Sequence, residues 1–278
     1  MSAEPLTPKQ LAAYLARIGH AEPLTPGLAT LRALHVAHIG AIPFENLDTQ
    51  LGTPPDFAAD GFDKLVTRRR GGWCYEQNGL LGRALMAAGF EVTRLAGAVM
   101  REARGDHTMG AHLALKVRID GDDWLADVGF GSAMLSPIRL AEGRDDSGPI
   151  PISLGQVPDG YWRLTAHSPV NPMSFDSHDA PADEAALERM CAWQGADESS
   201  IFVQNALARR LTPDAHLAVL GRQYQVTTRE GVTVRTIANA GDYVALLRDR
   251  FALHLPEAAR LWPAICARHK AVIGEKTA

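Results

Sequence analysis

The chain has 278 residues, 46% of them hydrophobic and 22% charged, with a net charge of −4, which is ordinary for a globular protein of one to three domains. Lysine and arginine are scattered apart from residues 68–70, so the basic stripe of a nucleic-acid-binding protein is missing and we expect no nucleic-acid partner. The start carries acid and proline instead of a signal-peptide pattern, no apolar run reaches bilayer-spanning length, and the three cysteines form no C-x-x-C pair, so we expect a cytoplasmic protein with no membrane partner.

The first ninety residues are predicted to be helical. A hexapeptide, AEPLTP, occurs at residues 3–8 and again at 21–26, and each copy indicates a helix start. In both copies the threonine can cap free amides, and the proline suits the first helical position, where its missing N–H would be unpaired anyway. A third helix is expected to begin near Cys74 and to stop at Gly89, which places the cysteine at a helix N-terminus.

From about residue 91 the pattern changes to the alternation typical of strands. Residues 112–119 and 124–128 flank Asp120-Gly121, a dipeptide that favours a two-residue hairpin turn. Residues 141–160 and 168–183, rich in Gly, Pro, Ser and Asp, indicate surface loops around a short strand. We also expect a helix near 184–194 that buries Leu187, Met190 and Cys191, a hairpin turn at Glu230-Gly231, and helices near 240–253 and 256–269. Helices first, then strands, then a mixed end predict an α+β fold.

Cys74 is the candidate nucleophile. A thiol attacks as its thiolate, and the pKa of a thiol falls at a helix N-terminus and beside an imidazolium. Cys74 meets the first condition, and Gly71 and Gly72 before it allow substrate or neighbouring backbone to come close. The alternative is that Cys74 is merely buried, as most free cysteines are.

The hairpin supplies the partners that such a thiol needs. With Asp120 and Gly121 as the loop, the register places His112 opposite Gly129 and Asp127 diagonal to His112 on the same face, at roughly 7–8 Å. The opposite face is apolar, so we expect that face to pack on the core and the two polar residues to lie away from it. A histidine oriented by a carboxylate is the base that a thiol nucleophile requires.

Other uses of these residues are less well supported. His112 alone would be an ordinary surface histidine. A zinc site lacks paired cysteines at metal-ligand spacing, so we expect no metal. The segment 129–132 lacks the lysine and the full glycine spacing of a phosphate-binding P-loop.

Four segments then resemble the signatures of the arylamine N-acetyltransferase family, in order and in spacing. They are IPFENL at 42–47, RGGWCYEQN at 70–78, HLAL at 112–115 and DVGFG at 127–131. The resemblance implies a papain-like cysteine core built from three parts. These are an N-terminal helical bundle over 1–90 carrying the cysteine, a β-barrel domain over 91–195 carrying the histidine and aspartate, and a C-terminal α/β lid over 196–278.

The resemblance also implies a function. Acetyl-CoA would be the co-substrate, and an arylamine or arylhydrazine would accept the acetyl group in a ping-pong reaction. In that reaction Cys74 is acetylated, His112 is the base and Asp127 is the acid that orients it.

Five further residues gain a role from the resemblance alone. Arg70 and Glu45 match the supporting ion pair of the family. Phe44 and Phe130 match its aromatic wall around the acceptor amine, with core packing as the alternative, and Phe202 matches more loosely.

Two rival functions share these residues. An amide synthase or a transglutaminase-like thiol hydrolase would use the same triad with a different acyl donor. A redox-sensing or ligand-binding domain would oxidise Cys74 without turnover, but it leaves Asp127 unexplained. Nothing in the sequence specifies the acyl chain, the acceptor amine, the CoA-contacting residues or an oligomeric state.

Overall fold

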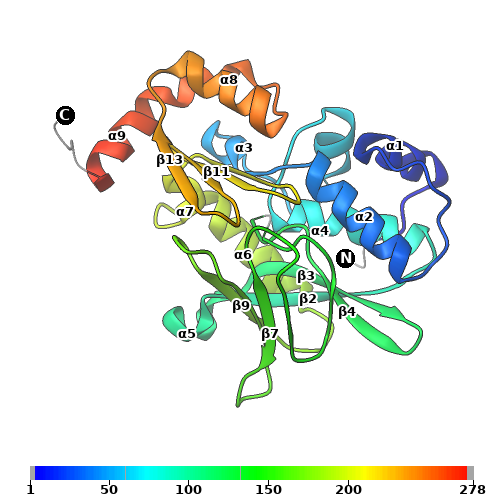
Figure 1. Ribbon diagram of the computed structural model, residues 1–278. Helices are drawn as coiled ribbons and strands as arrows, with labels where there is room; N and C mark the ends of the chain where they lie inside the picture. The colour runs from blue at the N-terminus through cyan, green and yellow to red at the C-terminus, as the bar shows by residue number, and fades with distance from the viewer. Residues whose placement is uncertain (1–3, 60, 132, 274–278) are drawn as a thin grey trace.

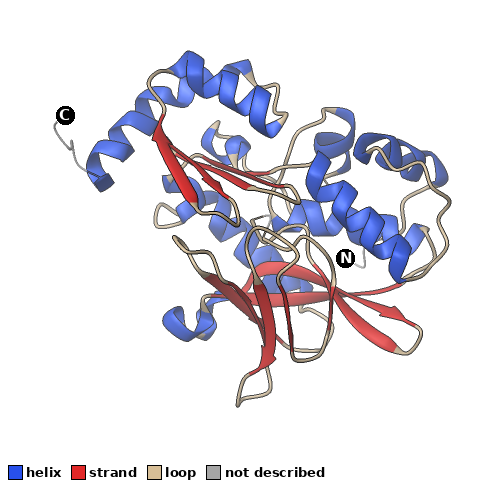
Figure 2. Ribbon diagram, in the orientation of Figure 1, coloured by secondary structure: helices blue, strands red, loops and turns tan. Residues whose placement is uncertain are grey.

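The computed structural model describes residues 4–59, 61–131 and 133–273. Figure 1 shows helices of the first ninety residues, a strongly curved sheet below them, and a second sheet with the C-terminal helices beside both. The strands gather in two separate groups (Figure 2). This mixture of helix and sheet, with one sheet curled towards a barrel, agrees with the α+β prediction.

The N-terminal helices show that only one of the two hexapeptides starts a helix as expected. Helix α1 (Pro8–Ile18) begins after Thr7, whose hydroxyl accepts from the Gln10 amide. Helix α2 (Leu28–Ala41) instead begins after Gly27, and the prediction that Thr25 caps it is wrong. Because the Gly27 backbone is still extended, the chain enters the helix two residues late, and the Thr25 carbonyl accepts from the Thr30 hydroxyl.

Helix α4 (Cys74–Ala87) begins at the cysteine, as predicted, and the chain leaves it through Gly89, whose φ is 88°. Short elements precede it. They are strand β1 (Phe44–Glu45), helix α3 (Leu47–Gln50) and the π-helical turn η1 (Asp63–Thr67). Helices α1, α2 and α4 enclose an apolar core that includes Tyr14, Leu31 and Leu81.

An eight-stranded antiparallel sheet follows, in the order β5-β4-β3-β2-β9-β8-β7-β6. Its strands are β2 (Glu91–Val99), β3 (Met109–Ile119), β4 (Asp122–Ala126), β5 (Ile138–Arg139), β6 (Gly143–Asp145), β7 (Ile152–Gln156), β8 (Trp162–Ala166) and β9 (Met173–Ser177). Two short helices, α5 (Arg101–Arg104) and η2 (Asp106–Thr108), link β2 to β3.

The β3–β4 hairpin has the predicted turn and register. Asp120 and Gly121 both have positive φ, 51° and 88°, and Ile119 pairs with Asp122. Strand β4 ends at Ala126, so the ladder stops short of the expected pair between His112 and Gly129.

Two expectations about this sheet are wrong. The segments 141–160 and 168–183 are not simply loops, because they contain β6, β7 and β9. Each segment holds a short run of alternating apolar residues, of which Ile152, Leu154 and Phe175 are buried. The surrounding Gly, Pro, Ser and Asp dominate the composition and hide this pattern. The hairpin also has two buried faces instead of one. Val117 packs on the helical core, while Ala114 packs inside the curved sheet.

The second sheet joins distant parts of the chain. Its antiparallel order is β1-β10-β11-β12-β13, with β10 (Leu207–Leu211), β11 (His216–Leu220), β12 (Gln223–Thr227) and β13 (Val232–Thr236). The hairpin at Glu230-Gly231 is confirmed. Helix α8 (Ala240–Phe251), the 3₁₀ turn η3 (Pro256–Leu261) and helix α9 (Trp262–Ile273) pack against this sheet and confirm the two predicted C-terminal helices.

Helix α6 (Glu184–Ala196) and helix α7 (Ile201–Gln204) connect the two sheets, and α6 runs through the middle of the molecule (Figure 1). It packs on β3 and buries Leu187 and Cys191 as predicted, whereas Met190 is only half-buried. Within the residues that the structure describes, no helix has the length and apolarity needed to cross a bilayer.

Candidate active site

Cys74 is the first residue of α4, and its helix start is closed by a carboxylate. The Glu76 side chain accepts from the Trp73 amide at 3.2 Å, and the Gln77 amide donates to the Trp73 carbonyl at 3.0 Å. The Glu76 carboxylate and the first helical hydrogen bond together hold Trp73, the residue before the cysteine, in an extended conformation. Only 4% of Cys74 is exposed.

The two glycines before Cys74 are required by a close backbone approach. The loop lies along β1, where the Gly72 amide donates to the Pro43 carbonyl at 3.2 Å and the Glu45 amide donates to the Gly72 carbonyl at 3.1 Å. A Cβ at Gly71 would collide with the same Pro43 carbonyl, and one at Gly72 would lie 2.6 Å from the Glu76 carboxylate. The glycines therefore let neighbouring backbone come close, as the sequence indicated.

The hairpin meets the cysteine helix at Gly129. A Cβ there would lie 2.6 Å from the Cα of Cys74, so a glycine is needed for the loop after β4 to press against the start of α4. Asn78, one turn along the helix, fastens the same junction. Its amide group donates to the Leu113 carbonyl at 2.6 Å and to Asp127 at 2.8 Å, and its oxygen accepts from the Val128 amide at 2.9 Å.

Sequence reasoning missed Asn78. The signal for it was its spacing, because a polar residue four positions after Cys74 lies on the same face of the helix.

The structure brings together the three residues predicted for the triad. His112 Nε2 lies 2.7 Å from Asp127 Oδ2, and Cys74 is close enough to the same imidazole to contribute to the rise in its pKa. Because Nε2 faces the carboxylate, Nδ1 is the ring nitrogen left for the thiol. The second carboxylate oxygen accepts from Asn78 and from the Gly129 amide, both at 2.8 Å, so Asp127 is held at both oxygens.

Burial makes this pair electrostatically strong, which contradicts the expectation that it lies away from a core. His112 and Asp127 are 2% and 1% exposed, because the curved sheet forms a second core on their face. Burial alone would lower the pKa of His112, but the Asp127 charge and hydrogen bond, with the Cys74 contact, raise this pKa to about 10. Burial would raise the pKa of Asp127, but His112, Asn78 and the Gly129 amide hold it below its usual value. The ring therefore favours its protonated form, which stabilises a thiolate beside it.

The predicted ion pair between Arg70 and Glu45 is present within a larger network. Arg70 Nη2 lies 2.8 Å from Glu45 Oε1 and 2.8 Å from Asp48 Oδ1. Lys64 Nζ lies 3.1 Å from Asp48 and 3.0 Å from Glu76. Sequence reasoning gave no role to Asp48, Lys64 or Glu76 in this network, because only the fold brings them together. The network joins β1 to the carboxylate that caps the cysteine helix, and so it fixes the loop before the thiol.

The three predicted aromatic residues lie near the triad. Phe44 lies in the same apolar cluster as Cys74, and its ring centroid is 6.1 Å from that of Phe202. Phe130 packs against the base, with its ring centroid 5.1 Å from that of His112. Phe44 and Phe130 are buried, so both also have the packing role that was the alternative for them.

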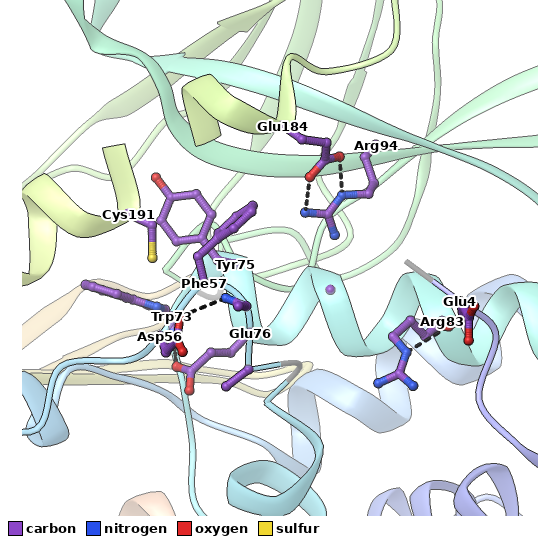
Figure 3. Close-up of a pocket in the computed structure, with 13 residues that line it drawn as sticks. Glu4, Asp56, Phe57, Trp73, Tyr75, Glu76, Arg83, Arg94, Glu184 and Cys191 are labelled. Atoms are coloured by element: carbon purple, nitrogen blue, oxygen red, sulfur yellow. Dashed lines mark hydrogen bonds and ion pairs between the residues drawn. The ribbon is translucent and has the colours of Figure 1, made fainter. Parts of the chain in front are cut away.

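A separate cavity of about 570 Å³ lies beside the site. Trp73 and Tyr75 line it, whereas Cys74 between them does not. Figure 3 shows the Arg94–Glu184 pair, with N–O distances of 2.7 and 3.1 Å, at the same cavity. Among the described residues, no group of His, Cys, Asp and Glu is arranged to hold a metal ion.

Comparison with known proteins gives a consistent result. A family model described as N-acetyltransferase matches residues 27–260. The arylamine N-acetyltransferase of Mycolicibacterium smegmatis is 36% identical over 267 residues, which cover 90% of this chain and 94% of that protein. The Escherichia coli K12 enzyme of the same name is 30% identical over 262 residues, with 88% and 89% covered.

Solved structures agree. The Salmonella typhimurium arylamine N-acetyltransferase superposes with a TM-score of 0.83 at 27% identity, covering 94% of this chain and all of that one. The Mycobacterium marinum enzyme in complex with CoA gives 0.82 at 33% identity, covering 94% and 99%. The chain belongs to the arylamine N-acetyltransferase family and is an acetyltransferase.

Proposed function

We propose that this protein transfers the acetyl group of acetyl-CoA to the nitrogen of arylamines or arylhydrazines, in a ping-pong reaction through acetyl-Cys74. The observation that carries the proposal is the His112–Asp127 hydrogen bond in a loop and strand that pack against Cys74 at Gly129. Membership of the family supports it, as does the Mycobacterium marinum relative that was solved with CoA.

In the first half of the reaction, the Cys74 thiolate attacks the thioester carbonyl of acetyl-CoA. The Cys74 backbone N–H lies at the start of α4, the positive end of the helix dipole, and would stabilise the developing oxyanion. The new S–C bond forms first, and the oxyanion then collapses as the C–S bond to CoA breaks. CoA then leaves as a thiol after taking the proton held by His112.

In the second half, the acceptor nitrogen attacks the acetyl carbon while the neutral imidazole of His112 removes its proton. Asp127 keeps the ring oriented and stabilises the imidazolium that forms. An arylamine suits this step because it is neutral at pH 7 and is flat enough to lie along Phe44, Phe130 and Phe202. Collapse of the tetrahedral intermediate releases the amide and restores the thiolate–imidazolium pair.

We further propose that the three parts of the chain divide these tasks on a papain-like core. Residues 1–90 would carry the nucleophile, 91–195 the base and its carboxylate, and 196–278 would cover the site as a lid. The change from helices to the eight-stranded sheet, and then to the five-stranded sheet, supports these boundaries. The reaction as written uses acetyl-CoA as co-substrate, requires no metal and takes place in the cytoplasm.

Intact mass spectrometry after mixing with acetyl-CoA tests the proposal. The wild type is expected to gain one acetyl group and Cys74→Ala none, while Cys191→Ala and Cys266→Ala, which change the other two cysteines, keep the adduct. A wild type without an adduct, or an undiminished adduct on Cys74→Ala, would contradict it. Release of CoA that depends on added arylamine separates the transferase from a thiol hydrolase.

A further inference from the structure

Arg209 lies beside the loop after β4, residues 127–131, and the reaction proposed above does not use it. It is on β10, directly opposite Phe44 of β1, and residues paired across two strands share a face of the sheet. Its guanidinium extends over Gly131, where a Cβ would collide with it. Gly131 follows Asp127 by four residues, and Gly129 of the same loop touches Cys74. Arg209 therefore lies on the side of the sheet that carries the acceptor-facing Phe44.

This guanidinium has no counter-ion among the described residues. The polar contact recorded for it is to the thioether sulfur of Met173 at 3.4 Å, a weak acceptor. Burial lowers the pKa of Arg209, and no carboxylate in the described part of the chain acts against that effect. The residue is nevertheless only half-buried, so part of it stays accessible to solvent. A desolvated charge without a partner is costly, and such a group is ready to accept an anion.

His216, the titratable neighbour of Arg209, adds no second positive charge beside it. Its Nε2 lies 3.1 Å from the Gly131 carbonyl, and burial together with the Arg209 charge lowers its pKa to about 4. The imidazole is therefore neutral at physiological pH. Its Nδ1 is buried and has no hydrogen-bond partner within the described part of the chain.

Arg210, the next residue on β10, shows what a structural arginine looks like in this strand. It donates to the Gly40 carbonyl at 3.1 and 2.7 Å and to the Arg250 carbonyl at 3.2 Å. These contacts tie β10 to helix α2 and to helix α8. Arg209 and Arg210 thus offer a matched comparison between an unpaired and a paired guanidinium.

We propose that Arg209 binds an anionic group, a carboxylate or a phosphate, on a substrate of this enzyme. The inference rests on the proposed function and adds a specificity to it. A guanidinium offers two parallel N–H donors that match either group. The anion has two sources, a carboxylate on the aromatic ring of the acceptor or a phosphate of CoA. The position of Arg209, opposite Phe44 and over the loop that carries Phe130, suits a ring substituent pointing away from the thiol.

Steady-state kinetics with paired substrates test this inference and separate the two sources. The acceptor pair is 4-aminobenzoate and 4-methylaniline, and the donor pair is acetyl-CoA and the acetyl thioester of N-acetylcysteamine, which has no phosphate. Arg209→Met is expected to lower kcat/KM about tenfold or more for the anionic member of one pair and to leave the neutral member within about twofold. A selective loss with 4-aminobenzoate identifies the acceptor carboxylate, and a selective loss with acetyl-CoA identifies a CoA phosphate.

Two controls separate this role from a structural one. Arg209→Lys should recover part of the selective loss, and Arg210→Met should affect both members of each pair equally. The melting temperature of Arg209→Met should be unchanged or higher, because the variant removes an unpaired charge. Equal losses with charged and neutral substrates, no loss with either, or a lowered melting temperature would overturn the inference. Turnover of 4-methylaniline by the wild type would still uphold the proposed function in each of those cases.

Discussion

Replacing Gly129 by alanine should disable the enzyme without unfolding it. The added Cβ would lie 2.6 Å from the Cα of Cys74 and 2.8 Å from the amide nitrogen of Asn78, whereas ordinary contact begins at 3.4 Å. The loop must therefore retreat by about 0.8 Å, because the opposing Cα belongs to helix backbone that cannot rotate away. Gly129 does not have a positive φ, so the effect is steric alone.

The loop carries Asp127, so its retreat shifts the carboxylate and the imidazole away from the thiol. A displacement near 1 Å at reacting groups lowers the rate by roughly 10²-fold, and overpacking a tight contact costs about 1–3 kcal/mol of stability. The assay is kcat/KM for acetyl transfer together with urea unfolding. Gly155→Ala on β7 is the matched control, because a Cβ there meets nothing within 4 Å. Equal activity of the two alanine variants would refute the reasoning.

Three further predictions concern the groups that hold the triad. Asn78→Ala removes three hydrogen bonds, so urea unfolding should show a loss of about 1–3 kcal/mol and kcat/KM should fall at least tenfold; unchanged values would contradict the fastening role. Glu45→Gln removes one of the two carboxylate partners of Arg70 and should cost about 1–3 kcal/mol in the same assay, against little effect for the exposed pair variant Asp63→Asn. Because the folded-state pKa of His112 is raised to about 10, its contribution to stability is full below about pH 6.5 and is lost as pH rises towards 10. Unfolding followed from pH 6 to 10 should therefore show a steeper decline in the wild type than in Asp127→Asn, and equal slopes would contradict the cause given for the shift.

Local chemistry explains which parts of the fold the sequence predicted. The turn at Asp120-Gly121 follows from two positive φ values that few other residue pairs accept, and the pairing of Ile119 with Asp122 follows from that turn. The start of α4 at Cys74 was also predictable from local sequence, because the two glycines before it and the helical spacing of apolar residues after it lie close by. Thr25 failed as a cap because Gly27, two residues later, was free to stay extended.

Long-range packing explains what the sequence did not predict. Strands β7 and β9 are stabilised by pairing with neighbouring strands in a curved sheet. No local pattern in the sequence indicates that both faces of β3 are buried. Asp48 and Lys64 join the Arg70 network only because α3 and η1, which carry them, pack against the loop before Cys74. The contact between the hairpin and α4 depends on Gly129, whose need for space is visible only when Cys74 lies against it.

The most direct test of the central claim is isotope exchange in the absence of any amine. If Cys74 carries the acetyl group between the two half-reactions, the enzyme should move label from free CoA into acetyl-CoA, because the first half-reaction is reversible without an acceptor. The wild type is expected to catalyse this exchange and Cys74→Ala is not. An enzyme that acetylates an arylamine but shows no exchange until the amine is added would contradict the acetyl-Cys74 intermediate.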